Sequence, residues 1–241
     1  HRVHQDHSRP RLGRDSHPAA RILIARVRLH ELEGDLAGAA EAARDAADTA
    51  RRAGADPSER AELQAKAEAL AARLGDTAAA GRLRDVALAA AADPRVALET
   101  RSAVSQALAE VRFNAEAFEE ARAETDRALG LLIRAGLASG PRYVQLLRLR
   151  GLAGYFLAER HPEALDAAIL DLSDALGADE GSMSAPERAD VELTLAAAYL
   201  ARERDGDTAR GCAKLRELMT SPRRLPTERI GPELMELCSI E

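Results

Sequence analysis

Bulky aromatic residues are nearly absent from this chain of 241 residues, which has no tryptophan, three phenylalanines and three tyrosines. A core without large rings must be filled by leucine, valine and alanine. Alanine is the commonest residue, and small side chains let helices approach one another closely. No run of alternating β-branched residues, the pattern of a strand, occurs anywhere in the sequence. The composition therefore predicts an all-α protein with closely packed helices.

Cysteine is also scarce, because Cys212 and Cys238 are the only two in the chain. Two cysteines make neither the disulfide framework of a small secreted domain nor a zinc site. Both fall in segments of helical pattern, beside leucines such as Leu215 and Leu237. We therefore expect reduced thiols and, since no signal peptide is visible, a cytoplasmic location.

The chain also lacks long apolar runs and the common catalytic motifs. No apolar stretch reaches the roughly 18 residues of a membrane span, so we expect no membrane association. There is no phosphate loop, no dinucleotide-binding glycine pattern and no nucleophile elbow. His30-Glu31 is not followed by the second histidine of a zinc protease. We predict that the chain is not an enzyme, with no catalytic residues and no cofactor.

Charge is unevenly distributed along the chain. Residues 1–28 hold seven arginines and two aspartates, whereas the whole chain has a net charge of −6, so the remainder is acidic. An acidic body argues against nucleic acid as a partner for this region. Residues 1–18 lack helical periodicity and are interpreted as a basic arm or linker, either a solvated tail or an arm that contacts phosphate or an acidic partner.

Three histidines, His1, His4 and His7, lie in this basic segment. On a helix they would share one face and could bind a metal ion. Because the segment has no helical pattern and no cysteine or carboxylate cluster to complete a site, we predict no metal site. The chain opens at His1 and not at methionine, so we expect it to be a fragment of a longer protein.

An alanine-rich helical hairpin recurs five times, at a spacing of roughly 41–44 residues. Each copy carries a pair of alanines in its second helix. The pairs are Ala39 and Ala46, Ala80 and Ala87, Ala121 and Ala128, Ala164 and Ala168, and Ala209 and Ala213. A fixed period of this length indicates a helical-repeat solenoid, in which each repeat packs on its neighbours.

Capping signals delimit the hairpins. Asp56-Pro57 and Asp93-Pro94 each predict a helix start, Ser184 and Glu187 form a capping box, and glycines such as Gly54 and Gly136 end helices. The predicted helices include 19–33, 36–53, 94–114, 116–136 and 206–220. We expect an arm or linker over 1–18, the repeat domain over 19–220 and a C-terminal capping helix over 221–241.

The third copy, with Leu108-Ala109, Phe118, Ala121 and Ala128-Leu129, resembles the tetratricopeptide repeat (TPR). The fourth copy matches through Tyr155, Ala164 and Ala168. The period exceeds the common 34 residues, and such long repeats resemble those of bacterial regulatory and signalling proteins. The resemblance implies a right-handed α-α superhelix of about five hairpins plus a C-terminal capping helix, with the first helices lining a concave groove.

The repeat frame predicts which residues face this groove. The candidates are Arg28, Gln106, Glu110, Phe113, Asn114, Leu149, Phe156 and Asp190. Phe113 and Phe156 fit the core between repeats equally well, and the polar stripe of Gln106, Glu110 and Asn114 fits a solvated face equally well. The carboxylate clamp that some family members use to bind peptide C-termini is missing.

The resemblance implies a scaffold that binds a protein or peptide in the groove, as the interaction or sensor part of a larger cytosolic bacterial regulatory protein. The alternative is the effector-binding domain of a transcription regulator that recognises a small molecule or signalling peptide. The sequence also leaves open whether the chain forms a homo-oligomer.

Overall fold

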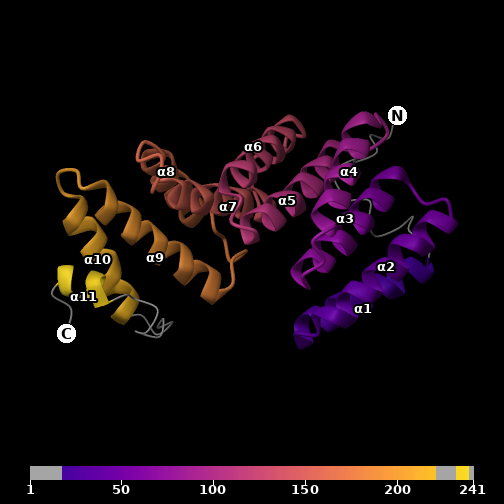
Figure 1. The fold of residues 1–241 in the computed structure, drawn as a ribbon, viewed down its shortest axis with the longest axis horizontal. Coiled ribbons are helices and arrows are strands. Elements are labelled where there is room, and N and C mark those ends of the chain that lie inside the picture. Colours follow the sequence, from indigo (N-terminus) through magenta and orange to yellow (C-terminus); the bar gives the residue numbers. More distant parts are fainter. Residues whose placement is uncertain (1–17, 221–231, 239–241) are drawn as a thin grey trace, which may run out of the picture. The chain divides into compact units, whose positions relative to one another are not determined.

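The computed structural model describes residues 18–220 and 232–238, and the regular secondary structure of this part of the chain is all helical (Figure 1). The helices are α1 (Pro18–Glu33), α2 (Leu36–Arg52), α3 (Pro57–Arg73), α4 (Ala79–Ala92), α5 (Leu98–Asn114), α6 (Phe118–Arg134), α7 (Pro141–Leu157), α8 (Ala164–Gly177), α9 (Ala185–Arg202), α10 (Asp207–Thr220) and α11 (Pro232–Leu237). The predicted basic arm, with His1, His4 and His7, lies outside the described residues.

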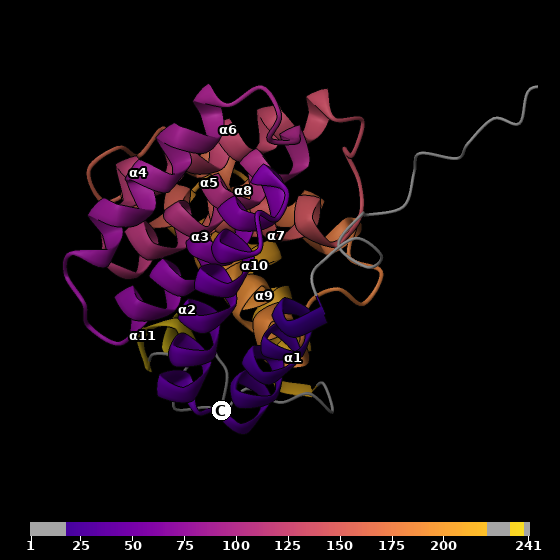
Figure 2. The ribbon, with the colours of Figure 1, turned by 90° about the vertical axis from the view of Figure 1, so that its right-hand side faces the viewer.

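The chain divides into two compact units, and the division falls inside α5. Unit 1 ends at Val111 and unit 2 begins at Arg112. Each unit is built from helices that pack on the next helix in sequence. In unit 1, α1 lies beside α2, α2 beside α3 and α3 beside α4 (Figures 1 and 2). In unit 2, the same holds for α6 to α10.

Capping side chains set most helix starts where the sequence predicts them. The Asp56 carboxylate accepts the Ser58 backbone N–H at 2.8 Å, with Pro57 in the first turn of α3. At the start of α9, Ser184 and Glu187 form the predicted capping box, in which each side chain accepts the other residue's backbone N–H. These bonds satisfy donors that a helix N-terminus otherwise leaves without partners.

The start of the third hairpin differs from the prediction. We expected a helix from Pro94, but α5 begins at Leu98. Asp93 caps a turn by accepting the Arg95 backbone N–H at 3.0 Å, and the Arg101 guanidinium donates to the Asp93 and Val96 carbonyls. These bonds hold residues 93–97 as a turn, with Val96 buried.

Alanine supplies most of the core between α1, α2 and α3 in unit 1. Six alanines of α2 are at most 1% exposed, namely Ala39, Ala40, Ala42, Ala43, Ala46 and Ala50. Val27 and Leu70 from the neighbouring helices pack against the first four of these alanines, and Leu63 of α3 packs against the last two. The alanines therefore set the distance between helices, as the composition predicts.

Glycines allow the closest helix contacts in unit 2. A Cβ added at Gly151 of α7 would lie 2.7 Å from Leu172 Cγ of α8, and one at Gly154 would lie 3.2 Å from Ala168 Cβ. A Cβ at Gly211 of α10 would lie 2.7 Å from Leu200 Cγ and 3.0 Å from the Ala196 carbonyl oxygen of α9. An alanine at any of these positions would require the facing side chain or backbone atoms to shift.

Both alanines of the predicted pair are buried in three of the five copies, and neither is buried in the fifth. Ala121, Ala128, Ala164 and Ala168 are buried, as are Ala39 and Ala46. Ala80 and Ala87 of the second copy are only partly buried. Ala209 and Ala213 of the fifth copy are exposed, because Gly211 takes the small-residue position against α9.

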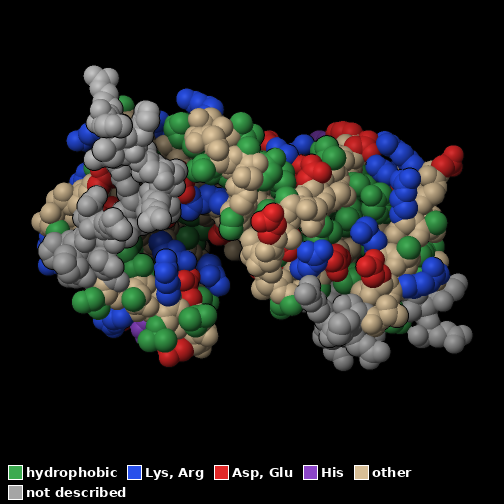
Figure 3. All heavy atoms as spheres, turned by 180° about the vertical axis from the view of Figure 1, so that it is seen from behind, with side chains coloured by type: hydrophobic (Ala, Val, Ile, Leu, Met, Phe, Trp, Pro, Cys, Tyr) green, Lys and Arg blue, Asp and Glu red, His purple; other side chains and the backbone are tan. Residues whose placement is uncertain are grey.

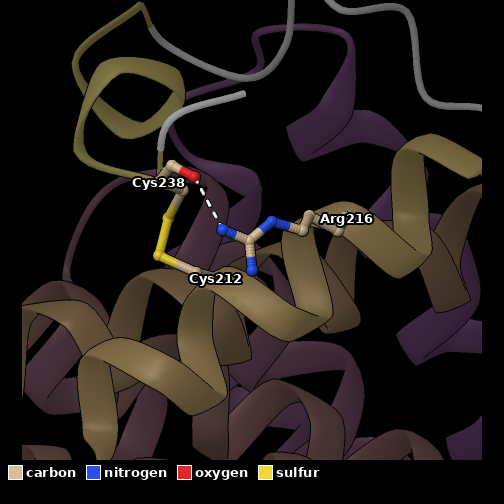
Figure 4. The surroundings of a disulfide bond; sticks show 3 residues. All are labelled: Cys212, Arg216 and Cys238. Atoms are coloured by element: carbon tan, nitrogen blue, oxygen red, sulfur yellow. Dashed lines mark hydrogen bonds between the residues drawn. A yellow bond between two sulfur atoms is a disulfide. The ribbon is translucent and has the colours of Figure 1, made fainter. Parts of the chain in front are cut away.

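The two cysteines form a disulfide, so the prediction of reduced thiols is wrong (Figure 4). Leu234 and Met235 of α11 pack on the cluster that contains Leu200, Leu215 and Cys212. This packing brings the Cα atoms of Cys212 and Cys238 to 5.2 Å, within the range for a disulfide. Arg216 Nη2 also donates to the Cys238 carbonyl oxygen at 2.9 Å. The short α11 is thereby fixed to α10.

The described surface of each unit mixes acidic and basic side chains (Figure 3). Many form local ion pairs, such as Arg127 with Glu124 and Arg51 with Asp48, both at 2.8 Å. Of the helices in the described part of the chain, none combines the length and apolar character that crossing a bilayer requires.

Candidate functional site: an aromatic cluster in unit 2

All three phenylalanines of the chain come together in unit 2, with Tyr155 beside them. A tight turn brings the first two together: the Glu116 N–H donates to the Phe113 carbonyl at 2.9 Å and the Ala117 N–H donates to the Arg112 carbonyl at 3.0 Å. Glu116 adopts a left-handed conformation with φ 59° in this turn. Phe113 at the end of α5 and Phe118 at the start of α6 then meet edge to face, with ring centroids 5.4 Å apart.

Phe156, in the last turn of α7, completes the cluster. Its ring stacks on Phe118 with centroids 4.9 Å apart and an interplanar angle of 13°, and meets Phe113 edge-on at 5.8 Å. Tyr155 lies edge to face against Phe156 at 5.4 Å. Offset-stacked and edge-to-face pairs are the favoured geometries of aromatic rings, so the four rings hold one another in place.

The aromatic cluster (Phe113, Phe118, Tyr155 and Phe156) is anchored in the core on one side and open on the other. Phe113 and Tyr155 pack against the main hydrophobic core of unit 2. Phe156 is 43% exposed, although it is one of the few large rings available to fill a core. The cluster is therefore a rigid apolar surface in a chain that is otherwise poor in aromatic residues.

Polar groups surround the cluster. Asn114, next to Phe113, is exposed, as are Glu159 and Arg160 at the end of α7. Burial, together with the negative charge of Glu159, raises the pKa of Tyr155 above its usual value. Tyr155 therefore stays protonated at neutral pH and keeps a hydroxyl that can donate and accept hydrogen bonds.

A hollow of about 430 Å³ lies where α6 and α8 begin and α7 ends. Two of its lining residues, Glu119 and Leu157, directly follow Phe118 and Phe156 in sequence. Arg122, Asp126 and His161 also line it, beside the apolar Ala123 and Ala164, so its walls combine charged and apolar groups. The apolar cluster and the charged groups that line the hollow together offer the two kinds of surface that a peptide side chain and its backbone require.

The structure places the predicted groove residues in different environments. Phe113, Asn114 and Phe156 belong to the cluster or its edge. Leu149 is only 4% exposed, so its side chain is not available to a partner and the groove prediction does not hold for it. Gln106 Nε2 donates to Glu110 Oε1 at 3.0 Å, which is the internal pairing expected of a solvated helix face.

The two remaining candidates lie on other helices. Arg28 is exposed on α1 in unit 1. Asp190 is half-buried on α9, where its backbone carbonyl accepts the Thr194 hydroxyl at 2.8 Å.

Sequence reasoning missed Phe118 and Tyr155 as members of this site. From the sequence, Phe118 is predicted only as part of the repeat pattern and Tyr155 only as part of the match of the fourth copy. The sequence signal that could have identified them is the clustering of its few aromatic residues. Four of the six lie beside one short turn or at the end of one predicted helix.

Chemically, the cluster suits binding more than catalysis. Its members are three hydrocarbon rings and one phenol. In the described part of the chain, no group of three or more histidine, cysteine, aspartate or glutamate side chains is placed to hold a metal ion.

Comparison with known proteins defines the class of fold. No protein-family model matches the chain, and no curated protein matches it in sequence. Among solved structures, BtubC (BKLC) from P. vanneervenii is similar with a TM-score of 0.62 and 18% identity, over 86% of this chain and 86% of that one. The chain thus has the fold of an all-α protein of repeated helical hairpins.

A second structure specifies the type of repeat. It is the Podosopora anserina putative kinesin light chain with nearly identical TPR-like repeats, with a TM-score of 0.61 and 16% identity, over 86% of this chain and 100% of that one. The fold is therefore that of the TPR-like α-α superhelix, and the fold class predicted from the sequence is confirmed.

Proposed function

We propose that this chain is a protein- or peptide-binding scaffold and that the aromatic cluster of unit 2 is its main anchor for a partner. The observation that carries the proposal is the 43% exposure of Phe156 within a cluster that gathers every phenylalanine of the chain. A chain with so few rings would bury them if stability alone decided their place. Rigid, partly exposed aromatic rings are typical of the residues that dominate binding energy at interfaces.

The cluster fits a hydrophobic side chain of a peptide. An incoming apolar group would cover Phe156 and the edges of Phe113 and Phe118, whose positions are already fixed, so little side-chain entropy would be lost on binding. Asn114 and the Tyr155 hydroxyl would bond to peptide backbone groups at the edge of the contact. Arg28, Gln106, Glu110 and Asp190 remain proposed contacts of the first-helix faces.

A peptide array probed with the full chain tests this proposal. Peptides with a large apolar side chain that bind the wild type should lose at least tenfold in affinity with Phe156→Ala and with Phe118→Ala. Leu170→Ala is the matched control, because Leu170 is an apolar residue of unit 2 that is 60% exposed on α8, outside the cluster. Its affinity should stay within twofold of the wild type. Unchanged binding by Phe156→Ala would overturn the proposal.

We further propose that the chain is the interaction or sensor part of a larger bacterial regulatory protein and that it has no catalytic activity of its own. This rests on the long repeat period and on the motifs that the sequence lacks. The full-length gene tests it: a DNA-binding or ATPase segment before His1 would support the effector-binding alternative. The cytoplasmic location predicted from the sequence loses its main support, because disulfides such as Cys212–Cys238 persist mainly in oxidising compartments.

A further inference from the structure

A second hollow, of about 410 Å³, lies in unit 1 among α2, α3 and α4. Its floor is made of small apolar side chains. They come from all three helices and include Ala47, Ala61, Ala67, Val86 and Ala90. The lining residues of α3 extend from Pro57 to Glu68, three turns of helix or about 16 Å. The hollow is therefore long, and its base is lined by small apolar side chains.

Three arginines, Arg44 and Arg51 of α2 and Arg60 of α3, line this hollow. Arg60 Nε is buried and has no hydrogen-bond partner among the described residues. Arg44 Nε donates only to the backbone carbonyl of Ala40, at 3.3 Å. A buried guanidinium nitrogen without a partner costs free energy, so it favours a ligand that supplies an acceptor.

The carboxylates in the same lining are already used by other arginines. The Glu68 carboxylate accepts a hydrogen bond from Arg82 Nε at 2.8 Å. Among the described residues, Glu68 forms no ion pair with Arg44 or Arg60.

Asp93 accepts two bonds from the Arg95 guanidinium, at 3.0 and 2.8 Å. Asp48 pairs with Arg51 at 2.8 Å. Among the described residues, neither Arg44 nor Arg60 forms an ion pair, although the charge of Asp93 lies close enough to act on Arg60. Their guanidinium groups therefore have donors left for a carboxylate of a ligand.

We propose that this hollow binds an acidic peptide segment, with Arg44 and Arg60 each holding a glutamate or aspartate side chain and the alanine floor receiving the small apolar residues between them. The planar guanidinium presents paired N–H donors that match a carboxylate. An extended chain advances about 3.3 Å per residue, so about five residues span the 16 Å of α3 that line the hollow.

This length and the apolar floor favour a peptide over a single small anion, which would occupy one arginine and leave the floor uncovered. A nucleic acid fits less well, because the chain as a whole has a net charge of −6 and repels a polyanion. The site is separate from the aromatic cluster, which lies in unit 2, so the two proposals can fail independently.

Fluorescence anisotropy of the full chain with defined peptides tests the proposal. The probe is a fluorescein-labelled octapeptide of alternating glutamate and alanine, and the reference is the same peptide with glutamine in place of glutamate. We expect the glutamate peptide to bind at least tenfold more tightly, and its affinity to fall as sodium chloride is raised. Equal affinity for the two peptides would overturn the proposal.

Variants locate the binding to the hollow. Arg60→Gln should lower the affinity for the glutamate peptide at least tenfold, and Arg44→Gln should lower it at least threefold. Arg60→Lys should retain part of the affinity. Arg84→Gln is the matched control, because Arg84 is an exposed arginine of α4 outside the hollow. It should change binding less than twofold, and circular dichroism should show that every variant stays helical.

Further measurements separate the alternatives. Phe156→Ala should leave binding of the glutamate peptide unchanged, which would keep this site distinct from the aromatic cluster. Full competition by millimolar glutarate would show that the ligand is a small dicarboxylate, and equal binding of a single-stranded oligonucleotide would show a general anion site. Either result, or unchanged binding by Arg60→Gln, would overturn the assignment to an acidic peptide.

Discussion

Phe118 and Phe156 stack nearly parallel, at 13° and 4.9 Å between ring centroids, although they belong to different hairpins of the repeat. The stack joins the first turn of α6 to the last turn of α7. Each ring also contacts Phe113, so no one of the three can move without loss of contact to the other two. The feature that offers a partner an apolar surface thus also helps to hold the two hairpins together.

We predict that the stacked pair is energetically coupled. In a double-mutant cycle with Phe118→Ala, Phe156→Ala and the double variant, the coupling energy should be about 0.5–1.5 kcal/mol. Urea unfolding followed by circular dichroism measures it. A cycle between Phe156 and the exposed Leu170 is the control and should give additive effects. Additivity in the Phe118–Phe156 cycle would show that the rings merely lie side by side.

The disulfide should contribute to the stability of unit 2. It closes a loop between positions 26 residues apart, and the loop-entropy relation gives about 3–4 kcal/mol for a loop of this length. Addition of a reducing agent should therefore lower the urea midpoint of the wild type. The double variant Cys212→Ala/Cys238→Ala should unfold at the lower midpoint with or without the reductant. Equal midpoints for the oxidised and reduced wild type would contradict this expectation.

Gly211 should be required for the contact between α9 and α10. In Gly211→Ala the new methyl group would lie 2.7 Å from Leu200 Cγ and 3.0 Å from the Ala196 carbonyl oxygen. We expect a loss of about 1–3 kcal/mol in the free energy of unfolding.

Gly130→Ala is the control for this prediction. Gly130 is also a helical glycine of unit 2, but a Cβ there would meet nothing within 4 Å. It should stabilise the protein by up to about 1 kcal/mol, because alanine favours the helix. If both variants changed the unfolding free energy alike, the close contact would have no energetic effect.

Helices and their ends could be predicted because their signals are local. The Asp56-Pro57 start and the Ser184–Glu187 capping box depend on residues within one turn of each other, and the structure places both as predicted. The start of α5 could not be predicted, because Arg101 and the bond from the Ala97 N–H to Ser58 Oγ, at 3.0 Å, hold residues 93–97 as a turn. The local signal of Asp93-Pro94 gives no sign of either contact.

The site was only partly predictable for the same reason. The repeat frame selected Phe113 and Phe156, but it also selected Leu149, which is buried. A one-dimensional frame gives the angular position of a side chain on its helix and not what packs over that position. The pairing of Cys212 with Cys238 likewise depends on where α11 lies against α9 and α10, which no spacing in the sequence specifies.

Asp93 should make part of the stability of unit 1 dependent on pH. Hydrogen bonds from the Arg95 guanidinium, and then from the Arg95 backbone N–H, lower the pKa of Asp93 from 3.8 to about 2. The folded protein therefore binds this proton more weakly than the unfolded chain does. The contribution of Asp93 is complete above about pH 5, where the carboxylate is charged in both states, and is lost as the pH falls from about 5 through about 2.

Comparison of the wild type with Asp93→Asn measures this contribution, because asparagine does not titrate. The urea midpoint of the variant should lie below that of the wild type at pH 6, and the gap should narrow steadily between pH 4 and pH 2.5. Asp85→Asn, which removes a negative charge from an exposed position on α4, controls for the change in net charge. If the difference in urea midpoint were the same at pH 2.5 as at pH 6, the charge of Asp93 would contribute nothing to stability. Asp93 would then act only through the hydrogen bonds of its turn.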